Sequence, residues 1–310
     1  MIRSIGILLF LSAAISSCRN NETVLESVKG LKDYPSASGM EFMDDKVYII
    51  GDDANNILVM DTSLNIIDSI SLYSFPDKRI PKDVKPDLEG MTQLQEKKLL
   101  ITGSGSLAPY RNIAWIVDPA TKQKDSIRLD TFYNRLSLFN IKEINIEGVA
   151  AIPGGIVLSN RGNRSNRKNQ LIFTRKDFWQ HQAHTVITTT LLGFNKDSNS
   201  FQGVSGLDYS RRSDRLLITV STEDTRNSLE DGAIGKSYLW IVKNISAKKS
   251  WKAINPDQII DLEKTDPRFK GHKIESVSVM KETEKFMYLL LAADNDDGSS
   301  SLFKVVVPIK

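Results

Sequence analysis

Cysteine and histidine are scarce in this sequence. The chain of 310 residues contains one cysteine and three histidines. A single cysteine excludes a disulfide framework, and neither residue type forms a cluster with the spacing of a zinc site. Walker and dinucleotide-binding fingerprints are missing, and Gly103-Ser104-Gly105-Ser106 is not a nucleophile elbow. These absences exclude several common classes of enzyme.

Neither sign of charge is in clear excess. Forty-one basic and thirty-eight acidic residues give a formal net charge of +3. Because these charges are dispersed along the chain, they argue against a nucleic-acid partner. Apolar residues make up 40% of the chain and charged residues 25%, which are ordinary fractions, and a chain of this length can bury a large core.

Long apolar runs are missing except near the start of the chain. Arg3 precedes the apolar stretch Ile5–Ile15, which is too short to cross a bilayer stably. Ile15-Ser16-Ser17-Cys18 resembles the bacterial lipobox, in which cleavage before the cysteine leaves a thiol that carries lipid. We therefore expect a lipoprotein signal peptide at residues 1–17, lipidation of Cys18, and a polar tether at residues 18–22. An ordinary signal peptide with an incidental cysteine is the alternative.

These segments predict a location for the protein. We expect a membrane-anchored lipoprotein of the cell envelope that faces the periplasm or the cell exterior. The predicted lipid on Cys18 would be its only contact with the membrane, and we expect a monomer.

Helical periodicity is almost absent after the tether. Runs of four to eight residues rich in Val, Ile, Leu, Tyr and Thr are separated by clusters of Gly, Asn, Asp, Ser and Pro. This pattern predicts an all-β chain. Internal repeats are the next signal to look for, because a period of a few tens of residues is typical of propellers and solenoids.

Five similar strings occur along the chain, each at the start of a group of strand patterns. A hydroxyl or acidic residue is followed by a small residue and then by an apolar one, except that the last string has serine as its small residue. The first four groups each contain four strand patterns, which is the composition of a propeller blade. The strings are Ser38-Gly39-Met40, Glu89-Gly90-Met91, Glu147-Gly148-Val149, Ser205-Gly206-Leu207 and Glu275-Ser276-Val277.

The last group is one strand short. It contains the patterns 274–279, 286–292 and 301–307, whereas Val24–Leu31 is a β pattern without a group of its own. Pairing the two would close the ring and remove an exposed sheet edge. We therefore predict a single β-propeller domain over residues 23–310, with five four-stranded blades closed by the N-terminal strand. A sixth blade would have to lie within 132–144 or 246–257, and neither segment contains four strand patterns.

The repeated strings also predict a site. The first strand of each blade lines the central axis, so one residue per blade would form a ring near the mouth of the channel. Carboxylates that face one another there repel, and their ionised forms need a cation, protons or a basic partner. Calcium binds six to eight oxygen ligands in flexible geometry, and this ring offers carboxylate and hydroxyl oxygens. The predicted Ca²⁺ ligands are Ser38, Glu89, Glu147, Ser205 and Glu275.

A second interpretation of the ring needs no metal. Glutamates at the start of the blades could accept hydrogen bonds from backbone amides of the neighbouring blade and so join the blades together. The two interpretations remain open on the sequence alone.

The order Ser, Glu, Glu, Ser, Glu, one residue per blade, resembles the calcium-dependent apyrases, five-bladed propellers whose central calcium is held by residues of these types. Leu88-Glu89-Gly90-Met91 and Ile146-Glu147-Gly148-Val149 are also similar to the Glu-Gly blade motif of esterase-like phytase propellers and of bacterial lipoproteins built in the same way. The resemblance covers nearly the whole predicted mature chain in architecture but only a few residues per blade. It implies a calcium-dependent hydrolase of phosphate esters or anhydrides, although the loops do not match the nucleotide-contacting residues of apyrases.

Polar turns between the second and third strands of each blade should surround the mouth of the channel. They are glycine-bearing or acidic, and two carry an arginine, whose planar guanidinium suits phosphate or carboxylate. A bound metal would polarise a phosphoryl oxygen or activate water. In such an enzyme, arginines would hold the anion and an acid would act as general base. The candidate catalytic residues are Asp52, Arg111, Arg161, Glu223 and Asp294.

Two functions therefore remain in view. The first is an exported, lipid-anchored propeller with a central calcium site that hydrolyses phosphate esters or anhydrides, with a phosphate-bearing anionic small molecule as its partner. The second is a non-catalytic propeller that binds a protein or glycan and uses calcium as a structural ion. The fold alone does not decide between them, because propellers include both enzymes and binding modules.

Overall fold

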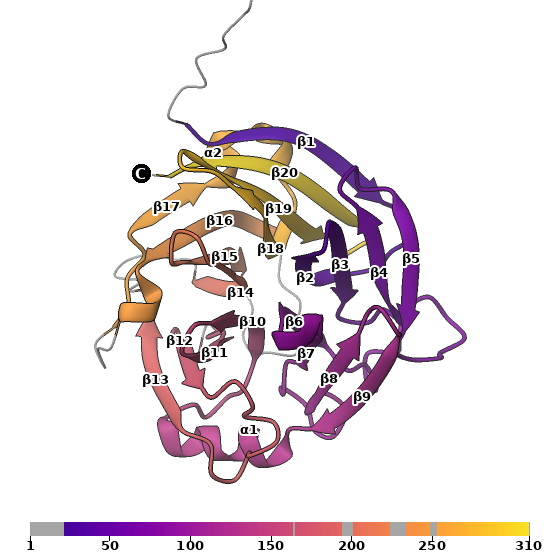
Figure 1. Cartoon of the computed structure of the whole chain (residues 1–310), viewed down its shortest axis with the longest axis vertical. Coiled ribbons are helices and arrows are strands. Elements are labelled where there is room, and N and C mark those ends of the chain that lie inside the picture. The colour runs from indigo at the N-terminus through magenta and orange to yellow at the C-terminus, as the bar shows by residue number, and fades with distance from the viewer. Residues whose placement is uncertain (1–21, 164, 194–200, 224–233, 249–252, 310) are drawn as a thin grey trace, which may run out of the picture.

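The chain forms a ring of five four-stranded antiparallel sheets, which confirms the predicted five-bladed β-propeller (Figure 1). A computed structural model describes residues 22–163, 165–193, 201–223, 234–248 and 253–309. The predicted signal peptide, Cys18 and most of the tether lie outside the described residues. None of the helices in the described part of the chain has the length and apolar composition needed to cross a bilayer.

Consecutive strands of each blade pair as antiparallel neighbours. Blade 1 contains β2 (Ala37–Met43), β3 (Lys46–Gly51), β4 (Asn56–Asp61) and β5 (Ile66–Ser71). Blade 2 contains β6 (Leu88–Gln93), β7 (Leu99–Gly103), β8 (Ile113–Asp118) and β9 (Gln123–Arg128). Blade 3 contains β10 (Ile146–Ile152), β11 (Gly155–Asn160), β12 (Asn169–Thr174) and β13 (Ile187–Leu192). Blade 4 contains β14 (Gln202–Ser210), β15 (Arg215–Glu223), β16 (Ile234–Lys243) and β17 (Gln258–Asp261).

Blade 5 is completed by the N-terminal strand, as predicted. It contains β18 (Lys273–Glu282), β19 (Phe286–Asp294) and β20 (Ser300–Pro308), and β1 (Val24–Leu31) pairs with β20 at its outer edge (Figure 1). Seven residue pairs join β1 to β20, from Val24 opposite Val306 to Leu31 opposite Ser300. Because both ends of the described chain belong to one sheet, unfolding either end opens the ring.

Helices are short and lie between strands. The α-helices are α1 (Asp130–Leu136) and α2 (Leu262–Thr265), and the 3₁₀ turns are η1 (Gln95–Lys97), η2 (Ser137–Phe139), η3 (Ile245–Ala247) and η4 (Pro267–Phe269). The first segment with room for a sixth blade holds α1 and η2, and the described part of the second holds η3. No sixth blade exists among the described residues.

The hydrophobic core is divided among the five interfaces between neighbouring blades. Each of five buried clusters combines side chains from two consecutive sheets; for example, Leu217 and Leu239 of blade 4 pack with Met287 and Phe303 of blade 5. Both faces of a blade are therefore buried, which explains the nearly continuous apolar character of strands such as β7.

A β-bulge occurs at the same place in all five inner strands. In β2, Ala37 lies opposite Gly51 and Gly39 lies opposite Ile50, so Ser38 has no partner in the ladder. The same two-against-one arrangement leaves Glu89, Glu147, Ser205 and Glu275 unpaired in β6, β10, β14 and β18. A bulge redirects a side chain and often lies beside a functional site. The five bulged residues are those that the sequence predicts as a ring.

The glycines after three of these residues are required by close contact between blades. A Cβ atom on Gly90 would lie 2.8 Å from the backbone nitrogen of Val149, and one on Gly148 would lie 2.7 Å from that of Leu207. A Cβ atom on Gly206 would lie 2.3 Å from the carbonyl oxygen of Glu275. The repeated glycine thus lets adjacent inner strands approach each other at the axis.

Candidate functional site

The two serines of the predicted ring join neighbouring blades. Both are completely buried. Ser38 Oγ donates a hydrogen bond of 2.5 Å to the carbonyl oxygen of Leu88, and Ser205 Oγ donates one of 2.8 Å to that of Ile274. Each acceptor directly precedes a ring glutamate, Glu89 or Glu275. These serine hydroxyls therefore position the strands that carry the glutamates.

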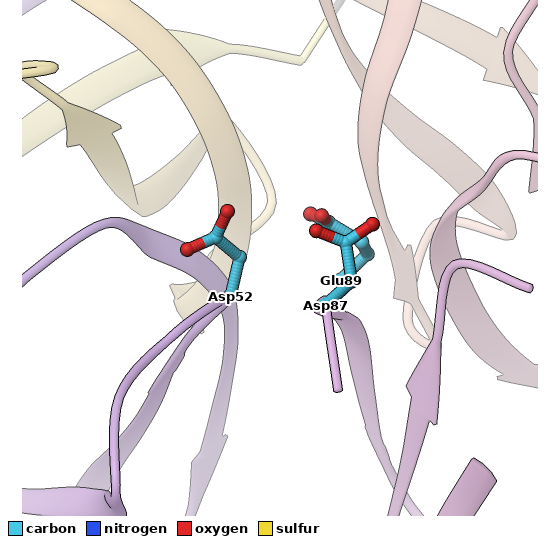
Figure 2. A group of neighbouring side chains, drawn as sticks. All are labelled: Asp52, Asp87 and Glu89. Atoms are coloured by element: carbon cyan, nitrogen blue, oxygen red, sulfur yellow. The ribbon is translucent and has the colours of Figure 1, made fainter. Parts of the chain in front are cut away.

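Glu89 lies in a group of three carboxylates at the mouth of the channel. Oxygen atoms of Asp52, Asp87 and Glu89 all lie within 4.8 Å of one another. In Figure 2, Asp52 faces the other two side chains across a gap. Asp52 follows β3 of blade 1, whereas Asp87 and Glu89 lie at the start of the inner strand of blade 2. We call the central region around these residues the hub.

Lys85 and Arg111 neutralise part of this acidic group. The ammonium of Lys85 forms ion pairs with both Asp52 and Asp87, at 2.7 Å for Asp87. Arg111 Nη1 lies 2.7 Å from Asp87 Oδ2, and Ser104 Oγ donates a hydrogen bond of 2.6 Å to the same oxygen. Asp87 is therefore held firmly in its ionised form.

The pKa values of the three acids differ accordingly. Burial opposes ionisation of Asp87, but the ion pairs with Lys85 and Arg111 outweigh it and lower its pKa. Burial raises the pKa of Asp52 to about 7, although the positive charge of Lys85 opposes the rise. Burial, together with the negative charges of Asp87, Glu147 and Glu275, raises the pKa of Glu89 well above its ordinary value.

Glu89 differs from its neighbours in having no partner. It makes no hydrogen bond or ion pair with any other described residue, and its side chain is half-buried. The charges of Glu147 and Glu275 act on it, so the three ring glutamates do lie near one another. An unpartnered carboxylate among other acids is a candidate for binding a cation or a proton.

The other two ring glutamates have cationic neighbours. Glu147 Oε2 lies 3.8 Å from Arg161 Nη1, and Asn145 Nδ2 donates a hydrogen bond of 2.5 Å to Glu147 Oε1. Glu275 Oε1 lies 2.8 Å from the ammonium of Lys273. All three ring glutamates therefore lie at the hub, but in different electrostatic settings.

The two candidate arginines are buried and engaged with protein groups. Arg111 contacts Asp87 and also donates a hydrogen bond of 2.8 Å to Ser106 Oγ. Arg161 donates one of 3.2 Å to Ser221 Oγ. A Cβ atom on Gly203 would lie 2.5 Å from Arg161 Nε, so the guanidinium packs directly against that glycine. Both arginines hold acids of the hub in position.

Two further candidate acids lie on other blades. Asp294, at the end of β19, accepts a hydrogen bond of 3.0 Å from the amide of Asp296, and burial raises its pKa to about 6. Glu223 ends β15, and its side chain lies outside the described residues.

The hub carries an excess of negative charge among its described residues. Its acids are Asp52, Asp53, Asp87, Glu89, Glu147, Glu275 and Asp294, and its cations are Arg79, Lys85, Arg111, Arg161 and Lys273. The seven carboxylates exceed the five cations by two charges. One divalent cation or two protons would balance this excess.

The residues present fit a hard divalent cation. Calcium prefers oxygen ligands, and the group at Asp52 consists of carboxylates. Asp52 Oδ1 is buried and has no hydrogen-bond partner among the described residues, which is costly for a carboxylate oxygen. An ion between Asp52 and Glu89 would satisfy it.

The opposite end of the channel has its own polar contacts. Three residues after each buried serine stands an acid, Glu41 in β2 and Asp208 in β14. Glu41 Oε2 accepts a hydrogen bond of 2.9 Å from the amide of Gln93, and Asp208 Oδ2 accepts one of 2.7 Å from that of Val279. The amide-to-carboxylate bridge that the sequence analysis considered for the ring is thus formed at this end by other acids.

Asp87 is a functional residue that the sequence analysis missed. Asp87 precedes Glu89 by two positions, but the bulge at Glu89 interrupts the regular alternation of the strand, so this spacing did not by itself place the two side chains together. Asp87 also adopts a left-handed backbone conformation, with φ of 51°. The pairing of Lys85 with an acid of another blade has no sequence signal.

The sequence was compared with protein families and with curated proteins. A model described as "Family of unknown function (DUF6929)" matches residues 33–307. No curated protein matches the chain in sequence.

Two solved structures have a similar fold. The crystal structure of Myxococcus xanthus glutaminyl cyclase has a TM-score of 0.54 at 9% identity and covers 93% of this chain and 97% of its own. The Malassezia sympodialis allergen Mala s 1 has a TM-score of 0.51 at 10% identity, with 91% and 96% covered. At these identities the likeness shows the fold alone. The resemblance to apyrases and phytases stays a prediction.

Proposed function

Since the chain belongs to the DUF6929 family, whose description assigns no activity, we propose from the geometry of the hub that it is a calcium-dependent hydrolase of phosphate esters or anhydrides. The observation that carries this proposal is the carboxylate group of Asp52, Asp87 and Glu89, with its excess of negative charge and the orphaned oxygen of Asp52. Calcium bound there would polarise a phosphoryl oxygen and lower the pKa of a coordinated water.

The protein residues have distinct proposed roles. Asp52 and Glu89 supply free carboxylate oxygens to the cation, whereas Arg111 keeps Asp87 ionised and Arg161 orients Glu147. The two guanidinium groups therefore position carboxylates of the hub and do not contact the anionic substrate directly.

Lys85 has a second role in this proposal. Its ammonium already lies between Asp52 and Asp87, so a divalent cation must displace it or share these ligands. A displaced ammonium, together with Lys273, would attract the anionic substrate. Asp294, whose pKa of about 6 is suited to proton transfer near neutral pH, is the proposed general base. Glu223 keeps its predicted place as an alternative base.

An assay of phosphoester turnover tests this proposal. We expect the purified protein to hydrolyse at least one of a panel of nucleotides, inositol phosphates and aryl phosphates in calcium, and to lose this activity in chelator. Glu89→Gln should abolish turnover, and Glu96→Gln, an exposed acid outside the hub, should not change it. Retained turnover in chelator contradicts the metal requirement.

The second candidate is a non-catalytic binding propeller with a structural calcium. The groove of about 700 Å³ between blades 2 and 3 favours it, because its walls include several apolar side chains and it is distant along the inner strands from the hub carboxylates. Calcium binding without turnover of any phosphoester would support this function, with a protein or glycan as partner.

We further propose that the protein is a monomeric lipoprotein of the cell envelope, anchored only through Cys18. This proposal rests on the apolar stretch after Arg3 and on the lipobox-like sequence at residues 15–18.

A further inference from the structure

A groove of about 700 Å³ lies between blades 2 and 3 on the face opposite the hub carboxylates. Gln93, at its inner end, lies at the far end of β6 from Glu89. Its walls include Leu94, Ile116, Ile127 and Trp179, which are only partly buried against the core between the two blades. The volume and the apolar walls are those of a site for a small organic molecule.

A smaller cavity of about 260 Å³ adjoins the groove at the end of the central channel opposite the hub. The two cavities share four lining residues: Gln93, Ala151, Tyr209 and Arg211. Glu41 and Asp208 line the smaller cavity. A molecule in the groove can therefore place one end beside these two acids and beside Glu282, whose carboxylate accepts a hydrogen bond from Ser210 Oγ.

These two acids lack a cationic partner. Each is 8% exposed, and neither forms an ion pair with a described residue. Their carboxylates accept hydrogen bonds from backbone amides, namely those of Gln93 for Glu41 and of Val279 and Tyr209 for Asp208. Buried acids are rare unless they are paired. A bound cation would supply the missing charge.

The cations that line the smaller cavity form no ion pair with Glu41 or Asp208 among the described residues. Arg211 lies close enough to lower the pKa of both acids, yet it is exposed and makes no hydrogen bond or ion pair with any described residue. Arg212 lies 3.8 Å from Glu284, and Lys281 lies over the ring of Tyr288. Burial and the charge of Asp208 still raise the pKa of Glu41 well above its ordinary value.

We propose that the two cavities form one binding site for an amphipathic primary amine, whose apolar body lies in the groove and whose ammonium contacts Glu41 and Asp208. The charge of the ligand follows from two buried acids without an ion pair, and its apolar body follows from the walls of the groove. This site is independent of the proposed calcium site, which lies at the other end of the inner strands.

Calorimetric titration with three probes of equal chain length tests the site: 4-phenylbutylamine, 4-phenylbutanol and 4-phenylbutanoate. We expect the amine to bind at least tenfold more tightly than the alcohol, and the carboxylate to bind most weakly. Glu41→Gln should weaken binding of the amine but not of the alcohol, and Asp208 should retain part of the preference for the amine. The amide oxygen of the substituted side chain can still accept the hydrogen bond from Gln93, so the fold should be kept, which thermal melting checks.

Two further variants separate the parts of the site. Trp179→Ala should weaken binding of the amine and the alcohol by similar factors, because it removes only a wall of the groove. Glu89→Gln, at the hub, should leave amine binding unchanged. Equal affinity for amine and alcohol, no binding of any probe, or an amine preference that is undiminished in Glu41→Gln would each overturn the proposal. None of these results depends on phosphoester turnover or calcium.

Discussion

The proposed calcium site should exchange protons for the metal ion. In the absence of metal at pH 6, Asp52, with a pKa of about 7, is largely protonated, and Asp294, with a pKa of about 6, is about half protonated. The pKa of Glu89 is also raised well above its ordinary value, by burial and by the charges of its acidic neighbours. Calcium binding requires ionised carboxylates. We expect about one to two protons to be released per ion at pH 6, which matches the excess of two negative charges at the hub.

This exchange of protons for calcium predicts how the stability of the protein changes with pH. An acid with a raised pKa in the folded state binds a proton that the unfolded chain releases. The stability of the metal-free protein in chelator should therefore fall as the pH rises from about 4 to 7. Calcium removes this loss, because the ionised oxygens of Asp52 and Glu89 then face a cation. Calcium affinity should therefore rise roughly tenfold or more per pH unit near pH 6.

Calorimetry in buffers of different ionisation enthalpy counts the protons, and thermal melting gives the stabilisation. Free calcium at a hundred times its dissociation constant should stabilise the protein by about 2.7 kcal/mol, or roughly 4 to 5 °C in Tm. Glu96→Gln is the matched control. Equal melting temperatures in calcium and chelator at pH 7.5, or calcium binding that releases no protons at pH 6, would refute the reasoning.

Three other perturbations test the fold, the ring and the anchor. Gly206→Ala places a Cβ atom 2.3 Å from the carbonyl oxygen of Glu275 and should lower the free energy of unfolding by about 1–3 kcal/mol, measured by urea denaturation. The control Gly154→Ala, whose Cβ atom would have nothing within 4 Å, should be nearly neutral. Ser38→Ala removes the hydrogen bond to Leu88 and should cost about 1 kcal/mol with little change in calcium affinity; a tenfold loss of affinity would instead make this serine a ligand. Cys18→Ala should release the protein from membranes on fractionation, and persistent membrane association would contradict the lipid anchor.

Much of the architecture could be predicted from local sequence patterns. The repeated string of Ser or Glu followed by a small residue identified all five inner strands, because close approach of neighbouring blades requires a small residue at each bulge. The lone pattern Val24–Leu31 predicted the closing strand with the observed bounds, since an incomplete last blade leaves an edge that needs a partner. Both signals are local: a repeat and a strand pattern with its turn residues.

The sequence alone thus determined the number of blades, the way the ring closes and the five residues that stand at its centre. Only the tertiary structure decided their environments. The hydroxyls of Ser38 and Ser205 donate hydrogen bonds to neighbouring blades. Asp52 lies beside Glu89, and Lys85, from another connection, pairs with Asp52. Strand patterns depend on near neighbours in the chain, whereas charge pairing depends on distances across the ring, which the packing of all five sheets sets together.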